Sequence, residues 1–152
     1  MKKLWILGAV ALIGSGIVGI MQATAAPADS VKYRQAVMRG VGASMGNISA
    51  ILKGDVAHGA NHIRANAEAM QQYAGLTRDA FRENTGATGP TKAKPNTWTA
   101  WADFETKSRN FEAEVNKLVE LSRGPSPNIV AIGDQMKALG GTCGACHREY
   151  RE

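Results

Sequence analysis

Two cysteines and one histidine near the C-terminus are the residues best suited to do chemistry. They form the sequence CGACH over residues 143–147, and the chain has no other cysteine. Residues three apart share a face of a helix, so the thiols of Cys143 and Cys146 can both reach the vinyl groups of one porphyrin. His147 can then ligate the iron, and the small residues between the cysteines leave the macrocycle unobstructed. The pattern predicts one covalently bound haem c.

Two other interpretations of these residues fit the sequence less well. A redox dithiol of the thioredoxin type needs a preceding strand within alternating strands and helices, which the sequence lacks. A zinc site needs four ligands, and His58 and His62 have a usable spacing. They precede the cysteines by some eighty residues, in the reverse order to a zinc finger. We interpret these histidines as solvated residues near the start of a helix.

The first 25 residues have the three parts of a secretory signal. Two lysines supply the basic start, an uncharged apolar run covers residues 5–21, and Ala23-Thr24-Ala25 is a cleavage pattern. We predict cleavage after Ala25 and export to the periplasm, which leaves one domain over residues 26–152 and no membrane span. The apolar run is close to the shortest length that crosses a bilayer, so an uncleaved membrane anchor is the alternative.

Composition and charge exclude several classes of protein. Hydrophobic residues make up 44% of the chain, charged residues 20% and aromatic residues 6%, a globular balance rather than a disordered one. Without the two lysines of the signal, the net charge falls from +5 to +3. The basic residues are scattered rather than gathered in one stripe, so we expect no nucleic-acid partner. Abundant alanine and few β-branched residues favour helices.

Amphipathic helices are expected to position the motif. Four segments repeat apolar residues at steps of three and four, over 29–52, 56–81, 97–122 and 127–152. A loop rich in glycine and proline covers 84–95, and we expect Ser126 to cap the last helix with Pro127 at its first position. Val56 and Ile129 are expected to face inward. The predicted fold is all-α, an antiparallel up-down four-helix bundle with the haem near the C-terminal helix.

Two features of the first helix need an explanation beyond helix formation. Arg34 interrupts an apolar stripe, where a charge is costly unless it is paired. Haem propionates would pair with it; alternatively, its side chain extends to water at the end of the bundle. Gly40, Gly42 and Gly46 each cost about 1 kcal/mol relative to alanine. Close approach of the haem or of a partner helix would offset that cost, or a well-packed bundle tolerates it.

Four stretches of sequence occur together in a way that resembles one family. They are Tyr33-Arg34-Gln35, Gly42-Ala43-Ser44-Met45, Ala93-Lys94-Pro95 with Trp98, and the CGACH motif with its flanks over residues 140–151. Taken with the signal and the helices, they resemble the class II c-type cytochromes, the cytochrome c′ group. The resemblance covers the whole chain after the signal and implies a four-helix bundle with one covalent haem c.

The resemblance also implies roles for individual residues. It places Arg34 and Gln35 at the haem propionates. It places Arg151 at a basic position that neutralises a propionate, although a solvated chain end is an equal alternative for this residue. In the family the first helix forms dimer contacts, so the choice between monomer and homodimer stays open.

Met38 lies one helical turn after Arg34, at the family's distal position. Low-spin members place a methionine on the iron and carry electrons, whereas cytochrome c′ proper blocks this position with an apolar side chain and binds gases. A thioether is a good ligand for haem iron, so we expect Met38 and His147 as axial ligands. The expected function is single-electron transfer between periplasmic redox partners. The alternative is a five-coordinate haem that binds nitric oxide or carbon monoxide.

No nucleophile, general acid or general base stands out around the motif. The sequence therefore predicts a carrier or binding protein and no enzyme.

Overall fold

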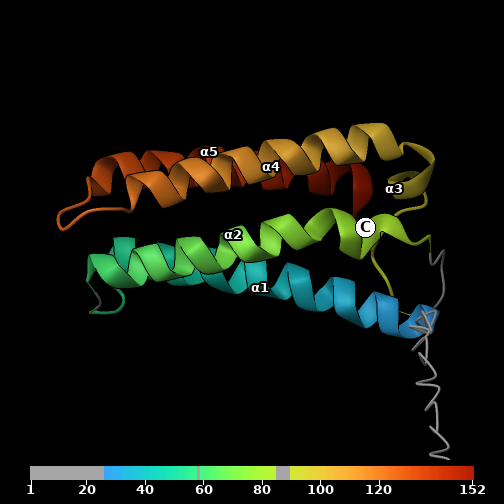
Figure 1. The fold of residues 1–152 in the computed structure, drawn as a ribbon, viewed down its shortest axis with the longest axis horizontal. Helices are drawn as coiled ribbons and strands as arrows, with labels where there is room; N and C mark the ends of the chain where they lie inside the picture. Colours follow the sequence, from blue (N-terminus) through green and yellow to red (C-terminus); the bar gives the residue numbers. More distant parts are fainter. Residues whose placement is uncertain (1–25, 58, 85–89) are drawn as a thin grey trace, which may run out of the picture.

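The computed structural model of the chain describes residues 26–57, 59–84 and 90–152 (Figure 1). The predicted signal over residues 1–25 lies outside this part, as do His58 and residues 85–89 of the predicted loop. None of the described helices is both long and apolar enough to cross a membrane.

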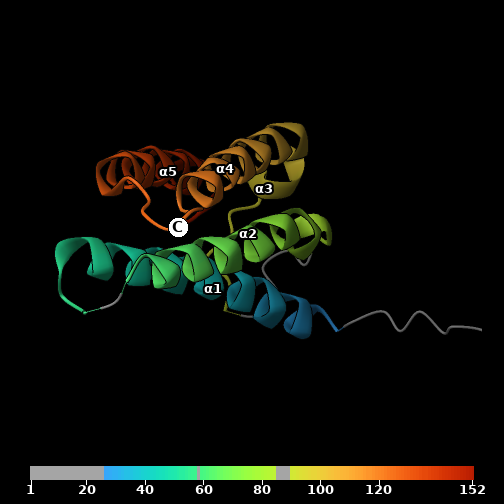
Figure 2. The same cartoon turned by 60° about the vertical axis from the view of Figure 1, so that its left-hand side comes forward.

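The described residues form helices and no strand. The helices are α1 (Pro27–Lys53), α2 (Ala60–Arg82), α3 (Asn96–Thr99), α4 (Trp101–Leu121) and α5 (Ile129–Tyr150). The pair α1 and α2 makes one layer and the pair α4 and α5 makes the other, as Figures 1 and 2 show from two directions. Successive long helices run in opposite directions (Figure 1). The predicted all-α up-down four-helix bundle is confirmed.

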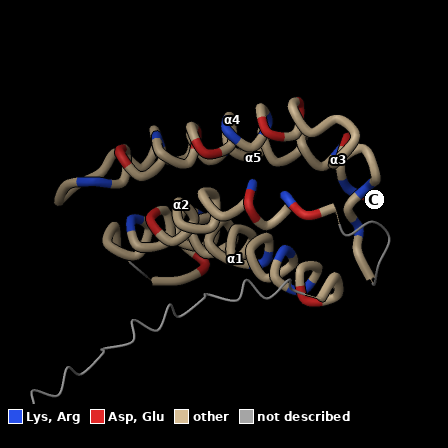
Figure 3. Tube along the Cα trace, turned by 45° about the vertical axis from the view of Figure 1, so that its right-hand side comes forward, with Lys and Arg blue, Asp and Glu red and all other residues tan. Residues whose placement is uncertain are grey.

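The core lies between these two layers, and charged residues are spread along the helices of both (Figure 3). The largest apolar side chains with at most 1% exposure come from all four long helices, and they are Ile48, Ile63, Met70, Val115, Leu118, Val119, Ile132 and Leu139. Each contributes about 1.5–3 kcal/mol to the free energy of unfolding through its burial. They follow the apolar stripes that predicted the helices, so these stripes do form the core.

The helix predicted over 97–122 is broken at Ala100. Its φ of −114° and ψ of 41° lie outside the helical region, so α3 is a separate turn before α4. The indole Nε1 of Trp98 donates to the carbonyls of Phe81 and Glu83, at 2.9 and 3.1 Å. These two carbonyls lie at the end of α2, where a helix has no backbone N–H left to donate to them. The break at Ala100 lets α3 turn Trp98 toward the end of α2.

The start of α5 was predicted wrongly. Asn128, not Ser126, caps this helix, because its side-chain oxygen accepts from the backbone N–H of Ala131 at 3.1 Å. The helix therefore begins at Ile129, after Pro127. Ile129 lies in the first turn and is 48% exposed rather than buried.

The start of α2 also differs from the prediction. Gly54 ends α1 in the left-handed region, with a φ of 78°, and Asp55 N–H then bonds back to the carbonyl of Ala50 at 3.0 Å. The chain needs several more residues to turn, so α2 begins at Ala60 instead of residue 56. Val56 lies in this turn and is exposed rather than buried.

The glycines of α1 separate into two kinds. A Cβ at Gly40 would overlap the ring of Tyr73 on α2, so partner-helix approach explains this glycine. A Cβ at Gly42 or Gly46 would meet no other residue within 4 Å, so partner-helix approach explains neither. Gly42 lines the cavity described below, and close approach of the haem stays a prediction for this position.

Replacing Gly40 by alanine is expected to destabilise the protein. The forced displacement of the Tyr73 ring costs about 1–3 kcal/mol, which exceeds the gain of about 1 kcal/mol in helix propensity. Gly46→Ala is the matched control, and it is expected to stabilise by up to about 1 kcal/mol. Urea denaturation of both variants measures the difference. Equal stabilisation by both substitutions would contradict the role of close approach at Gly40.

Candidate functional site

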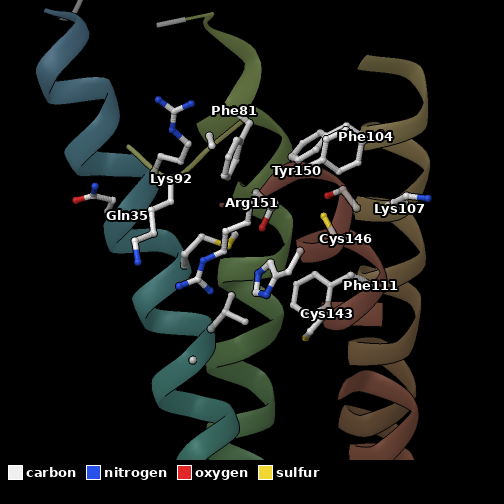
Figure 4. Close-up of a pocket in the computed structure, with 18 of the residues that line it drawn as sticks. Gln35, Phe81, Lys92, Phe104, Lys107, Phe111, Cys143, Cys146, Tyr150 and Arg151 are labelled. Carbon is white, nitrogen blue, oxygen red and sulfur yellow. The ribbon is translucent and has the colours of Figure 1, made fainter. Parts of the chain in front are cut away.

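A cavity opens between α1 and α5 at the end of the bundle that holds the C-terminus (Figure 4). Its volume is about 530 Å³, within the range of about 300–1,000 Å³ for small-molecule and cofactor sites. All seven residues predicted from the sequence as site residues line it, and they are Arg34, Gln35, Met38, Cys143, Cys146, His147 and Arg151. The fold thus brings residues from the two ends of the described chain to one site.

The wall on the α5 side carries the CGACH motif. Cys143 and Cys146 lie one turn apart, are half-buried and border the same cavity, with free thiols. Burial raises the pKa of both thiols. Burial, followed by the charge of Arg151, lowers the pKa of His147, which favours the neutral imidazole that binds metals. The motif therefore presents two thiols and a metal-binding imidazole to one space.

On the α1 side, an apolar stripe accompanies the polar lining residues Arg34, Gln35 and Arg39. Met38, Val41 and Met45 border the cavity at successive turns. Phe81 from α2 and Phe104 from α4 continue the apolar lining, with ring centroids 5.1 Å apart (Figure 4). A flat apolar group that enters between α1 and α5 would be covered on both faces.

The charged residues that line the cavity are all basic. Arg34, Arg39, Lys92, Lys107 and Arg151 border it, and none of its described lining residues is an aspartate or glutamate. An anionic group would therefore meet only opposite charge here. Sequence reasoning missed Arg39, Lys92 and Lys107, because three separate segments contribute them and nothing in their spacing connects them.

Arg34 is buried beside the cavity, with 3% of its surface exposed. The alternative that it extends to water is therefore wrong. Its guanidinium carbon lies 5.0 Å from the centre of the Phe81 ring and 5.2 Å from that of Trp98, which are cation–π distances. Burial lowers the pKa of Arg34. Two aromatic rings thus hold this cation at the cavity wall.

Gln35 makes a contact that the sequence did not predict. Its Nε2 donates to the carbonyl of Pro90 at 2.7 Å. Gln35 lines the cavity as expected, but its amide group also ties α1 to the segment that follows residues 85–89.

The zinc alternative does not match the placement of His62. His62 is the third residue of α2, whereas Thr77 and Phe81 of the same helix line the cavity. At 1.5 Å per residue, His62 lies about 20 Å along the helix from Thr77. Among the described residues, no three side chains of His, Cys, Asp or Glu come together as a metal site.

Tyr150 closes the α4 side of the cavity. It is buried, packs edge-on against Phe104 at 5.3 Å, and its hydroxyl donates to the carboxylate of Asp103. Burial, with this hydrogen bond, raises the pKa of Tyr150 to about 12. The hydrogen bonds from Tyr150 and Lys107 lower the pKa of Asp103. The carboxylate thus stabilises the fold while it is ionised.

The contribution of Asp103 is expected to disappear in acid. Since its pKa is lowered on folding, its stabilising effect is present above the ordinary value of 3.8 and is lost as the pH falls through the lower folded value. Asp103→Asn is therefore expected to be less stable than the wild type at pH 7 and no less stable at pH 2. Urea denaturation at both values measures this. The exposed Asp134→Asn, which breaks only the pair with Lys137, is the control. A difference in stability between Asp103→Asn and the wild type that persists at pH 2 would contradict the stabilising role of the ionised carboxylate.

A comparison with known families decides the identity of the fold. The family model described as Cytochrome C′ matches residues 29–151. The chain belongs to the cytochrome c′ family. It is 32% identical to cytochrome c′ of Rhodospirillum rubrum, over 99% of both chains, and 30% identical to cytochrome c-556 of Agrobacterium tumefaciens, over 82% of this chain and 98% of the relative. The predicted resemblance is confirmed.

A solved structure of the family supports the same conclusion. The ferrous form of a cytochrome c′ variant from Alcaligenes xylosoxidans, with bound nitric oxide, superposes with a TM-score of 0.75 at 27% identity. The alignment covers 86% of this chain and 98% of that chain. Proteins of the cytochrome c′ family bind haem c and are typically periplasmic.

The lining of the cavity fits haem c. The paired thiols match covalent attachment, the neutral imidazole matches an axial ligand, and the apolar walls match a macrocycle. The five lining cations match the two propionates. The chemistry of the residues present is thus consistent with the group that the family binds.

Proposed function

We propose that this protein binds nitric oxide or carbon monoxide on the Met38 side of a single covalent haem c. Cys143 and Cys146 would hold the haem as thioethers, His147 would ligate its iron, and Arg34 and Arg151 would pair with the propionates. The iron supplies an open coordination position for a small neutral ligand. In this proposal the protein binds its ligand and catalyses no reaction.

The observation that carries the proposal is the apolar stripe that α1 contributes to the cavity. Its residues Met38, Val41 and Met45 offer no hydrogen-bond donor and no charge, whereas Arg34, Gln35 and Arg39 supply the polar part of the same side. Nitric oxide and carbon monoxide are neutral and need neither a donor nor a charge, so the apolar stripe suits them. The relative with bound nitric oxide has the same fold, which supports this choice.

Met38 is the side chain that the ligand must displace. Methionine is unbranched and has three rotatable bonds, so it can fill the space above a macrocycle and still move aside. It is half-buried and borders the cavity. In the proposed function, Met38 covers the iron in the resting protein and limits access without blocking it.

Electron transfer is the second candidate, and the thioether of Met38 favours it. With a methionine and a histidine bound, a haem iron keeps six ligands in both redox states, and its reduction potential is raised. The similarity to cytochrome c-556 is compatible with this candidate. In that case Met38 stays on the iron, and the partners are periplasmic redox proteins.

We infer that the working protein is the periplasmic chain over residues 26–152, released by cleavage after Ala25. Cytochromes c′ are often dimeric, and a homodimer is part of this proposal.

The optical spectrum of the oxidised holoprotein separates the two candidates. The proposed function predicts a high-spin spectrum, because Met38 covers the iron without binding it. A low-spin spectrum with the far-red sulfur-to-iron band would replace this proposal with electron transfer. Met136→Ala, in which the lost thioether is buried in the core away from the cavity, serves as the control for unspecific changes.

A further inference from the structure

A short segment over residues 90–96 closes the end of α5. The last four carbonyls of an α-helix have no partner inside the helix, and here they belong to residues 147–150. The carbonyl of Tyr150 accepts from the backbone N–H of Lys94 at 2.9 Å. Those of Arg148 and Glu149 accept from the side chains of Lys94 and Asn96, at 3.1 and 2.8 Å. Two residues distant in sequence therefore cap the helix that carries the motif.

Backbone pairing fixes this segment further. Ala93 forms an antiparallel bridge with Arg151, and the N–H of Glu152 donates to the carbonyl of Lys92 at 2.9 Å. The remaining free carbonyl, that of His147, accepts from the N–H of Arg151 at 3.1 Å. The chain that directly follows the expected iron ligand is thus held by hydrogen bonds.

The same segment is attached to α1 on the other side of the cavity. The amide of Gln35 donates to the carbonyl of Pro90, and Met38 lies three residues further along α1. Residues 90–93 themselves line the cavity. We call residues 90–96 the strap, because they join the wall that carries Met38 to the end of the helix that carries His147.

The strap matters because the two walls pack on different helices. In Figure 1, α1 lies against α2 and α5 lies against α4, in separate layers. The cavity occupies the space between α1 and α5. A direct connection between these walls at the cavity therefore limits how far they can separate.

Asn96 shows that the connection depends on a specific side chain. Its Oδ1 is buried without a hydrogen-bond partner, while its Nδ2 donates to Glu149. A buried unpaired oxygen costs about 1–3 kcal/mol. The amide therefore stays in place at a cost, and its hydrogen bond to the end of α5 offsets that cost.

We propose that Lys94 and Asn96 are positioning residues that, through the strap, set the distance between Met38 and His147 and so tune the binding of a sixth ligand. This inference rests on the proposed haem site. It predicts that loosening the strap changes properties of the iron although neither residue lines the cavity.

The test compares Asn96→Ala with Asn116→Ala in the holoprotein. Asn116 accepts an interhelix hydrogen bond of the same 2.8 Å from Gln71, and it does not line the cavity. Three quantities are measured: hydrogen exchange of the Lys94 and Glu152 amides, the reduction potential, and the carbon monoxide dissociation constant of the reduced protein. Lys94→Met, which keeps the backbone bond, is the second variant if Asn96→Ala folds poorly.

The expected result is faster exchange in the strap and a change of about 2- to 30-fold in the dissociation constant for Asn96→Ala, with the potential shifted as well. Asn116→Ala is expected to leave all three unchanged. If Asn96→Ala shows faster exchange but an unchanged potential and dissociation constant, the strap only caps α5, and the proposal is overturned. If the wild type binds no carbon monoxide, the proposed function fails, and the potential alone still decides the role of the strap.

Discussion

Protein in which Cys143 and Cys146 are both replaced by alanine is expected to lose its haem on denaturing extraction, whereas the wild type retains it. The reason is that the two thiols are the described chain's only cysteine sulfurs and both border the cavity. Without thioethers, only the axial bond of His147 and packing would hold the macrocycle, and both are lost on unfolding. Haem staining after denaturing electrophoresis measures the retained fraction.

Single replacements are the controls for this experiment. Cys143→Ala and Cys146→Ala each leave one thiol, so each variant is expected to retain stained haem through a single thioether. The exported wild type is expected to have the intact mass of residues 26–152 plus one haem. Haem retained by the double variant, or released by the wild type, would contradict covalent attachment at this motif.

Replacing Met38 by alanine is expected to raise the affinity of the reduced protein for carbon monoxide by about 10- to 100-fold. Burial of a methionine side chain is worth about 1.5–3 kcal/mol, and in the proposed function the ligand must displace that side chain. The resting spectrum is expected to stay high-spin. Titration with carbon monoxide and the spectrum before titration measure the two effects.

Met136→Ala is the matched control, because Met136 is buried in the core and does not line the cavity. It is expected to cost about 2–5 kcal/mol of stability and to leave the affinity unchanged. If Met38→Ala instead converts a low-spin spectrum to a high-spin one, Met38 is an axial ligand, and the electron-transfer candidate replaces the proposed function.

The motif and the helices were predictable because both are local in sequence. CGACH places two thiols and an imidazole on one helical turn, wherever that helix lies. The apolar stripes predicted which residues, such as Ile48 and Leu139, would be buried. Arg34 was recognisable as a site residue because a lone charge on an apolar stripe needs a special partner.

The strap and the helix boundaries were not predictable, because they depend on contacts between distant residues. Nothing in the spacing of Lys94 and Asn96 indicates that they cap the end of α5. The break at Ala100 accompanies the contact of Trp98 with the end of α2, which neither spacing nor composition indicates. The later start of α5 results from a choice between Ser126 and Asn128, two residues of similar capping strength.

The expectation of electron transfer rested on the chemistry of one residue. A thioether at position 38 can bind the haem iron, or it can lie over the iron and be displaced by a ligand. The two roles differ in the distance from sulfur to iron, which a sequence pattern does not contain. The proposed function treats Met38 as a displaceable cover, and the carbon monoxide titration distinguishes the two roles. Met38 lines the cavity as the sequence predicted, and its expected ligation of the iron stays a prediction.

Titration of the reduced wild-type holoprotein with carbon monoxide tests the central claim most directly. The account predicts saturable binding to one site per haem, with a shift of the haem spectrum on addition of the gas. A reduced spectrum that stays unchanged at saturating carbon monoxide would mean that Met38 holds the sixth position, and it would contradict the gas-binding function proposed for this protein.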